Sequence, residues 1–254
     1  MLEIRDLHFR YSKRSPEVLC GIDLVLGKGE IGILLGKNGA GKSTLFKIML
    51  GIEKPVSGNM ELNSVSLNSI SSTERSKHIA YVPQNISFGD LSVFDTVMTG
   101  RISYFGLRAG NEDHIAVKQT LDEMGLSDLA DRSADRLSGG EKQKVAIARA
   151  IVGSPQLIIF DEPSGNLDLA NERLLINEAK KLAKVHGISI LCSLHDLNEA
   201  AELGDKFFFM KDGIIRYDGG KEFFTEAVIK DIYGVRIKVN HLENQIIITG
   251  GTTL

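Results

Sequence analysis

The sequence has little cysteine, no long apolar segment and no strong excess of charge. Its two cysteines, Cys20 and Cys192, are too few for a disulfide framework and fit a reducing compartment. No apolar run approaches the roughly 18 residues that a membrane span needs. The longest runs, at 31–35, 157–160 and 207–210, have the length of strands. The formal net charge of −3 argues against nucleic acid or an anionic membrane surface as the main partner.

The sequence shows no internal repeat and no low-complexity segment, and we expect no secretion signal at its N-terminus. Its N-terminus alternates apolar and polar residues and carries an acid, Glu3, early. Hydrophobic residues make up 43% and charged residues 25%, an ordinary globular composition. The 254 residues suffice for one large domain, or a main domain with a small subdomain. We therefore expect a soluble, cytoplasmic protein.

Buried apolar strands that alternate with helices predict an α/β protein with a doubly wound parallel sheet. Residues 2–11 and 22–26 alternate as half-buried strands do, whereas 31–35 is apolar throughout, as in a strand buried on both faces. The other expected elements are helices at 42–50, 141–152 and 170–185, strands at 157–160 and 188–193, a hairpin of 207–210 with 214–217, and a tail from Lys221 with a short helix and small strands at 235–239 and 245–248.

Residues 36–43 match the phosphate-loop pattern G-x-x-x-x-G-K-[ST] at every fixed position. The loop follows a buried strand and precedes a helix, so its backbone N–H groups and the helix N-terminus can face phosphates. We expect Lys42 to reach the β- and γ-phosphates and the Ser43 hydroxyl to ligate Mg²⁺. The nucleotide-binding residues predicted from this motif are Gly36, Lys37, Asn38, Gly39, Ala40, Gly41, Lys42, Ser43 and Thr44.

The apolar strand at 157–160 ends in two acids, Asp161 and Glu162. At the C-terminal end of a parallel strand, Asp161 can face the Mg²⁺ site, and Glu162 can orient and deprotonate the attacking water. A strand that simply exits into a polar loop has the same pattern. The phosphate loop makes the catalytic interpretation the better one.

The pentad Leu-Ser-Gly-Gly-Glu at 137–141 stands shortly before this strand. Its residues Ser138, Gly139 and Gly140 are suited to hold phosphate, although the chain already has a phosphate loop. Two phosphate-binding loops in one domain imply either that the domain binds two nucleotides or that two copies of the chain share one.

With the pentad added, the motifs resemble those of the ABC-transporter ATPase family, and the resemblance covers essentially the whole chain. Gln84 resembles the family's glutamine-loop residue, which implies contact with Mg²⁺ and the membrane partner. His195 resembles the switch histidine that contacts the γ-phosphate, and Tyr11 the aromatic that stacks on adenine. Residues 164–168 resemble the loop that crosses to the opposite subunit. Each match is weak alone, since such residues are ordinarily structural, and their order and spacing together carry the inference.

The resemblance implies a P-loop NTPase with a RecA-like parallel sheet core, an N-terminal antiparallel β subdomain and an all-helical signature subdomain. Residues 1–254 would form a single ABC ATPase domain. Within it, 1–84 and 137–220 would be the core with its antiparallel part, 85–136 a helical insertion and 221–254 a small C-terminal extension. Helical spacing in the insertion is carried by Val117, Leu121 and Met124.

The family works as a head-to-tail pair of ATPase domains with ATP and Mg²⁺ as cofactors, which implies an ATP-sandwich homodimer here. ATP on Lys42 and Ser43 of one copy would be covered by Ser138, Gly139, Gly140 and Glu141 of the other. The membrane-spanning permease would be a separate polypeptide, which places this chain on the cytoplasmic side of the membrane, and an extracytoplasmic binding protein would complete the system. The implied catalytic residues are Lys42, Gln84, Glu162 and His195, and the implied Mg²⁺ ligands are Ser43, Gln84 and Asp161.

Within the family, residues 96–101, 104–106, 212–215 and 232–235 resemble importers of iron–siderophore, haem, cobalamin and related metal complexes. Ser103 departs from the subgroup, where a proline often stands, and Asn166 occupies a place where many members have alanine. The segment 85–105 would receive the permease's coupling helix. Four of its apolar residues fit either a docking groove or the core of the insertion, namely Phe88, Leu91, Val93 and Phe94.

Two other functions fit parts of the pattern. One is a soluble ABC ATPase without a transport role, for example in iron–sulfur cluster assembly. The other is a DNA-repair or chromosome-structuring ATPase, which needs a long coiled coil that the 85–136 segment lacks. The sequence does not identify the transported substrate, because the ATPase of such a system does not contact it.

Overall fold

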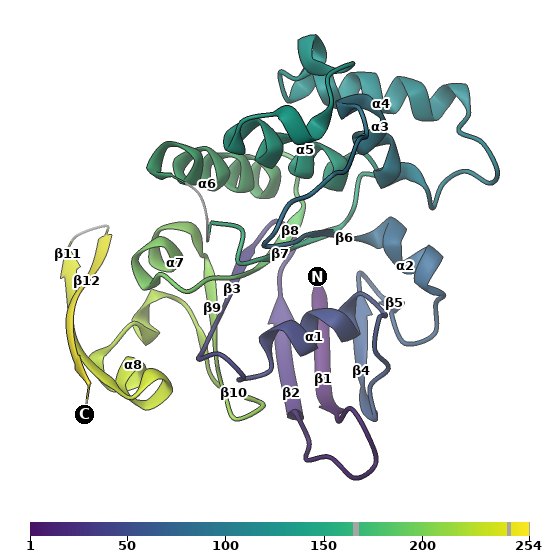
Figure 1. Ribbon diagram of the computed structural model, residues 1–254. Coiled ribbons are helices and arrows are strands. Elements are labelled where there is room, and N and C mark those ends of the chain that lie inside the picture. Colours follow the sequence, from purple (N-terminus) through teal and green to yellow (C-terminus); the bar gives the residue numbers. More distant parts are fainter. Residues whose placement is uncertain (165–167, 243–244, 254) are drawn as a thin grey trace.

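The computed structural model describes residues 1–164, 168–242 and 245–253, and its strands form three sheets (Figure 1). The strands are β1 (Leu2–Phe9), β2 (Leu19–Leu26), β3 (Ile31–Leu35), β4 (Ser57–Leu62), β5 (Val65–Ser66), β6 (Ile79–Val82), β7 (Leu157–Asp161), β8 (Ser189–Ser193), β9 (Lys206–Lys211), β10 (Ile214–Gly219), β11 (Val235–Leu242) and β12 (Gln245–Thr253). The α-helices are α1 (Lys42–Met49), α2 (Ser72–His78), α3 (Val93–Met98), α4 (Asn111–Glu123), α5 (Gly139–Ile151), α6 (Leu169–Lys184), α7 (Leu197–Leu203) and α8 (Glu226–Tyr233). The 3₁₀ turns are η1 (Thr99–Arg101), η2 (Ser127–Leu129), η3 (Ala134–Arg136) and η4 (Lys221–Phe223).

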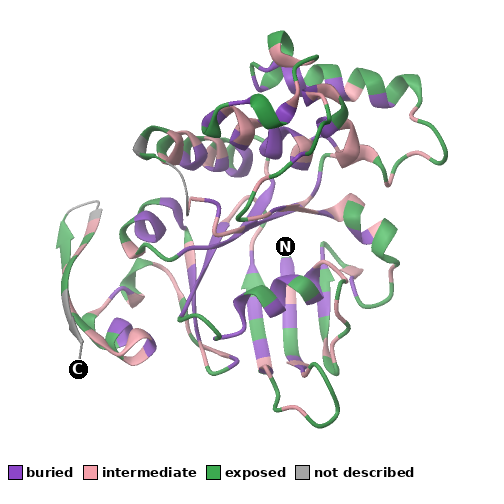
Figure 2. Cartoon of the chain, in the orientation of Figure 1, coloured by how far each residue is buried: buried purple, intermediate pink, exposed green. Residues whose placement is uncertain are grey.

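The central sheet has six strands in the order β10-β9-β3-β8-β7-β6. All of its neighbours pair in parallel except β10, which forms an antiparallel hairpin with β9. Every residue of β3 and β8 is buried, because helices and the second sheet cover both faces (Figure 2). The predicted α/β class with a parallel core is therefore confirmed.

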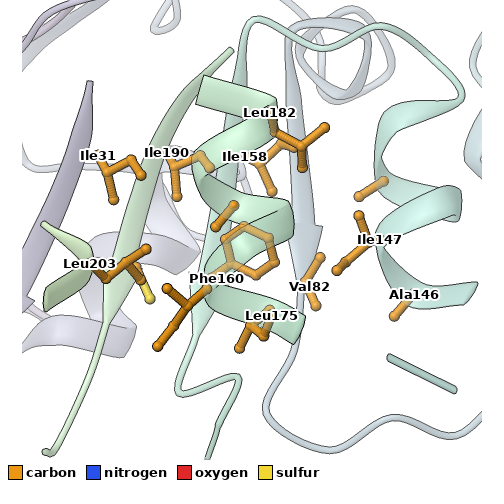
Figure 3. Close-up of a cluster of buried hydrophobic side chains, with 14 of the residues drawn as sticks. Ile31, Val82, Ala146, Ile147, Ile158, Phe160, Leu175, Leu182, Ile190 and Leu203 are labelled. Carbon is orange, nitrogen blue, oxygen red and sulfur yellow. The ribbon is translucent and has the colours of Figure 1, made fainter. Parts of the chain in front are cut away.

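One face of the central sheet packs against α5, α6 and α7. Figure 3 shows Ile158 and Ile190 of neighbouring strands in one cluster with Phe160, Leu182 of α6 and Ile147 of α5. Each of these side chains is at most 2% exposed, and burying one contributes roughly 1.5–3 kcal/mol. This face fixes α5 and α6 to the strands that carry the candidate site.

The other face packs against α1 and the four-stranded antiparallel sheet, whose order is β2-β1-β4-β5. The apolar positions of β1 alternate as predicted, but a bulge between Ile4 and Leu7, where Asp6 has a φ of 47°, shifts the register by one residue. Leu45 and Phe46 of α1 enter the core between the two sheets. The predicted antiparallel N-terminal part is thus present.

The described segment 85–136 contains only helices and turns, apart from an isolated bridge between Ser92 and Ser133. Ser92 caps α3 by accepting from the Asp95 N–H at 3.0 Å. Val117 and Leu121 are the buried face of α4, as their spacing predicted. The division of the chain into core, insertion and extension remains a prediction.

The last part of the chain is built into the main core. Phe224 is fully buried, with its ring edge-on to Phe207 and Phe209 of β9. The β11–β12 hairpin is joined to α7, because the Asn198 side chain accepts from the Ile248 N–H at 2.8 Å and donates to its carbonyl at 3.3 Å. None of the helices in the described residues is long and apolar enough to cross a membrane.

Candidate active site

The strands β3, β8, β7 and β6 lie side by side and parallel, and four of the segments predicted to act on ATP leave the same edge of them. The phosphate loop follows β3, His195 follows β8, Asp161 and Glu162 end β7, and Gln84 follows β6. In open α/β sheets, ligands bind at the carboxyl ends of the strands. The topology therefore gathers motifs that are far apart in the sequence.

The phosphate loop depends on glycine where the backbone is left-handed. Gly36 has a φ of 154°, and a Cβ there would lie 2.3 Å from the Met210 carbonyl oxygen. Gly41 has a φ of 109° and stands as the N-cap of α1 with no side-chain cap. The first N–H groups of α1 are consequently not used by a capping side chain and can bind an anion.

Lys42 is buried, at 5% exposure, and its ammonium group bonds to the loop itself. Its Nζ donates to the Gly36 carbonyl at 2.6 Å and to the Lys37 carbonyl at 3.3 Å. Burial lowers the pKa of Lys42, and the nearby carboxylates of Glu162 and Asp161 oppose that shift. The ammonium is thus bonded to the loop and lies within the field of the two acids that end β7.

A pocket of about 390 Å³ opens over this loop. Glu162 is part of its lining together with the phosphate loop, which is where we expect a water-activating base. Its described lining consists of Val18, Lys37, Asn38, Gly39, Gly41, Lys42, Ser43, Thr44 and Glu162.

Asp161 is held by hydrogen bonds from two neighbouring strands. Ser193 Oγ donates to Asp161 Oδ1 at 2.7 Å, and the Tyr81 hydroxyl donates to Oδ2 at 3.3 Å. Burial, together with the Asp161 charge, raises the pKa of Tyr81 to about 12, so this phenol stays a donor. Sequence reasoning missed both donors. The signal for Ser193 is its position at the end of β8, two residues before His195.

Glu162 has an unusual backbone and a close partner. Its φ is 50°, a left-handed conformation that is uncommon outside glycine. Its N–H donates to both the carbonyl and the Oγ of Ser193, at 3.1 and 3.0 Å. Its Oε1 lies 2.5 Å from His195 Nε2. The structure therefore joins the predicted base and the predicted switch histidine directly.

Two other predicted residues lie at the margins of the site. The Tyr11 hydroxyl is 3.1 Å from Thr44 Oγ1, and the ring is 53% exposed and edge-on to Phe9 at 4.9 Å. An exposed ring beside the start of α1 is available for stacking. Gln84 is exposed just beyond β6.

The pentad at 137–141 begins α5 and does not line the phosphate-loop pocket in the described residues. Ser138 caps the helix, its Oγ accepting from the Glu141 N–H at 3.4 Å. In return, the Ser138 N–H and Oγ donate to Glu141 Oε2 at 2.8 and 2.7 Å. These bonds lower the pKa of Glu141. A Cβ on Gly140 would lie 2.0 Å from Asn171 Oδ1 of α6. Gly139 and Gly140 thus provide a helix start without side chains, and neither is among the described lining of the chain's own phosphate-loop pocket.

A profile described as ABC transporter matches residues 19–165, more than half of the chain. The chain belongs to the ABC transporter ATP-binding family. Like the cassettes of that family, it is an ATPase that binds nucleotide through its P-loop fold.

Relatives of this ABC ATPase match it over nearly its full length. An uncharacterized ABC transporter ATP-binding protein of Methanocaldococcus jannaschii is 37% identical over 92% of both chains. The hemin import ATP-binding protein HmuV of Bordetella avium is 35% identical over 94% of both. The phosphonates import ATP-binding protein PhnC of Halobacterium salinarum is 31% identical over 92% of this chain and 83% of its own.

Solved structures of ABC proteins are similar in fold. A transporter described as of metal-chelate type, in an inward-facing conformation, gives a TM-score of 0.81 at 26% identity over 99% of this chain and 97% of its own. A dimeric ATP-binding cassette in a post-hydrolysis state with ADP and Pi gives 0.72 at 26% identity over 87% and 98%.

The loop predicted to cross to the opposite subunit lies partly outside the described residues, since Gly165, Asn166 and Leu167 belong to none of the described ranges. Its two ends are described. Asp168 caps α6 by accepting from the Asn171 N–H at 2.9 Å, and Ser164 bonds to α7.

Proposed function

We propose that this ABC ATPase is the energy-supplying subunit of an importer whose permease is a separate polypeptide. The hemin and phosphonate relatives, both named as import proteins, support this role and disfavour a soluble ATPase for iron–sulfur cluster assembly. The protein would then lie on the cytoplasmic side of the membrane, bound through the permease. An extracytoplasmic binding protein would deliver the substrate.

The observation that carries the catalytic assignment is Glu162, which faces the phosphate loop while it contacts His195. Glu162 would orient and deprotonate the attacking water, and His195 would hold that carboxylate and contact the γ-phosphate. Lys42 would leave its loop carbonyls for the β- and γ-phosphates, and Tyr11 would stack on adenine. Gln84 would approach the site from the permease side.

The residues present fit a Mg²⁺ ion bound with the nucleotide. Ser43 and Asp161 offer oxygen ligands, Asp161 being oriented by two donors, and Gln84 would add its carbonyl oxygen. The described residues contain no group of three or more His, Cys, Asp or Glu side chains that could hold a metal ion. Mg²⁺ in nucleotide sites usually takes most of its oxygens from phosphates and water. When bound, the ion supplies charge neutralisation at the phosphates.

The position of the pentad favours a head-to-tail homodimer. Ser138, Gly139 and Gly140 begin a helix outside the chain's own pocket, and the related dimeric cassette with ADP and Pi shows that such domains pair. The helix start would bind the γ-phosphate of ATP on the partner. Ser138 Oγ would exchange Glu141 for that phosphate.

The proposed permease surface lies in the segment 85–105. Leu91 is 41% exposed and Ile102 is 59% exposed, whereas Phe88 and Val93 belong to the core and Phe94 packs partly buried against it. The apolar surface left for a coupling helix therefore includes Leu91 and Ile102. In this proposal the helical segment 85–136 moves with the permease, and 221–254 supports the core.

For the substrate, we propose a metal complex such as an iron–siderophore, haem or cobalamin. The hemin relative and the transporter of metal-chelate type support this class, while the phosphonate relatives share comparable identity. Complexes purified with the co-encoded permease should show ATPase stimulation by the cognate chelate in liposomes. Stimulation by phosphonate and by no metal chelate would refute the proposed class.

The catalytic assignment is tested by Glu162→Gln. We expect ATP binding within about twofold of wild type, turnover lowered by about 10²–10⁴, and an ATP-dependent dimer in size exclusion. The control is Glu202→Gln, an exposed glutamate on α7 that pairs with Arg173, which should behave as wild type. Normal turnover in Glu162→Gln would refute the base assignment. Failure of Ser138→Arg to block dimer formation in the Glu162→Gln background would refute the sandwich.

A further inference from the structure

A buried carboxylate ties the loop after Glu162 to the helix after His195. Ser164 Oγ donates to Glu199 Oε2 at 2.7 Å, and Glu199 is 7% exposed. Its other oxygen, Oε1, has no hydrogen-bond partner within the described ranges. Burying a carboxylate with one hydroxyl partner is unfavourable, and an apolar side chain would stabilise the same position better. Stability alone therefore does not account for Glu199.

The Ser164–Glu199 bond is the outermost of three links between the loops that leave β7 and β8. The first joins the Glu162 N–H to Ser193, and the second joins the Glu162 carboxylate to His195. The third, at Ser164, is the last before residues 165–167. Together they hold the two loops in register beyond the ends of the sheet.

The third link matters because Glu162 is held in an unfavourable conformation. A left-handed backbone at a non-glycine residue costs on the order of 1 kcal/mol and persists only where the surroundings enforce it. Ser164 lies two residues further on, so its attachment limits how far the chain can relax. The attachment point is itself fixed, since Asn198 on the same helix is bonded to the backbone of Ile248.

The surroundings of Glu199 favour the neutral form of its carboxyl group. Burial raises the pKa of Glu199 to about 7, the Ser164 hydroxyl opposes the shift, and the carboxylates of Glu172, Asp196 and Glu202 add to it. The Cys192 thiol of β8 lies within the same field, since the Glu199 charge contributes to its raised pKa. A neutral amide can therefore replace this side chain without losing the bond to Ser164.

We propose that Glu199 is a positioning residue for ATP hydrolysis, which through Ser164 keeps the Glu162 carboxylate against His195 and the phosphate loop. Glu199 is not among the described residues that line the nucleotide pocket. The inference rests on the proposed role of Glu162 as the base. It adds to that role the residue that fixes the base in place.

The test compares Ser164→Ala, Glu199→Ala, Glu199→Gln and the double variant Ser164→Ala/Glu199→Gln by steady-state ATPase kinetics. We expect the two alanine variants to lose about 10- to 100-fold in kcat with KM for ATP within about twofold, because a small misplacement of a catalytic group slows chemistry without weakening binding. Glu199→Gln should keep kcat within about threefold, and the double variant should be no slower than Ser164→Ala. The control is again Glu202→Gln.

Wild-type kcat in both Ser164→Ala and Glu199→Ala, with Glu162→Gln inactive, would overturn the positioning role and leave the proposed function intact. Normal turnover in Glu162→Gln would instead overturn the base assignment. If Glu199→Ala does not fold, Ser164→Ala and the double variant carry the test. A wild-type kcat in Ser164→Ala, or losses that multiply in the double variant, would then refute the proposal.

Discussion

The Glu199 carboxylate should lower the stability of the protein at neutral and alkaline pH, and Glu199→Gln should remove that dependence. Burial raises its pKa from 4.5 to about 7. A carboxyl with a raised folded-state pKa binds its proton more tightly in the folded protein, so its contribution is full below pH 4.5 and is lost as the pH rises through 7. The glutamine side chain does not titrate, so the free energy of unfolding of Glu199→Gln should not change with pH through this position.

The size of the effect follows from the shift. Each pKa unit corresponds to about 1.4 kcal/mol, so between pH 5.5 and pH 8 the wild type should lose up to about 2 kcal/mol of unfolding free energy relative to Glu199→Gln. Solvent screening of the carboxyl reduces this value. The other charges that face Glu199, on Glu172, Asp196 and Glu202, are present in both proteins and largely cancel in the difference.

The assay is urea unfolding of the nucleotide-free protein at several pH values in that range, at equal m-values. The free-energy difference between variant and wild type should grow with pH and level off above pH 7. Glu202→Gln removes the smallest of the named contributions to the raised pKa of Glu199, so its free-energy difference from wild type should change much less with pH than that of Glu199→Gln. Parallel pH profiles for wild type and Glu199→Gln would show that the Glu199 carboxyl titrates normally and would refute the reasoning.

Two further predictions concern packing. In Gly100→Ala, the new Cβ would lie 2.1 Å from the Arg149 carbonyl oxygen, so we expect about 2–3 kcal/mol of destabilisation by thermal unfolding, whereas Gly106→Ala, whose Cβ meets nothing within 4 Å, should stay within about 0.5 kcal/mol. Equal melting temperatures for the two variants would contradict this. Arg75→Met removes a buried guanidinium that donates to the last carbonyls of α1 and to Leu67, which should cost about 3 kcal/mol in urea unfolding. A loss below about 1 kcal/mol would mean that these carbonyls find other donors.

The candidate site was predictable where its residues are contiguous in the chain. The glycines of the phosphate loop, the acids after β7 and the pentad each form a local pattern with a local physical reason. Strand order then brings Lys42, Glu162 and His195 to one edge of the sheet. The contacts that fix these residues were not predictable, because Ser193 and Glu199 reach their partners across strands and helices, and nothing in the local sequence marks them.

Two of the observed helices begin one or two residues earlier than predicted, and the shortest and least buried elements were not predicted. The helices predicted at 141–152 and 170–185 begin at Gly139 and Leu169, because Ser138 and Asp168 supply the N-caps. The prediction missed β4 and β5, since β4 has only two buried residues, and α2 and α7, since each is seven residues long. The roles of the site residues and the division of the chain remain predictions.

The position of β3 in the central sheet has a consequence for how the protein folds. This strand, which leads into the phosphate loop, pairs only with strands from much later in the chain, Ile31 with Ile190 and Gly32 with Lys206. Such non-local pairing is slow, because loop-closure entropy must be overcome before the contacts form. During synthesis, β3 therefore stays an unpaired apolar segment until β8 and β9 have been made. ATP, which needs the completed loop, can stabilise the folded protein only at the end of that process.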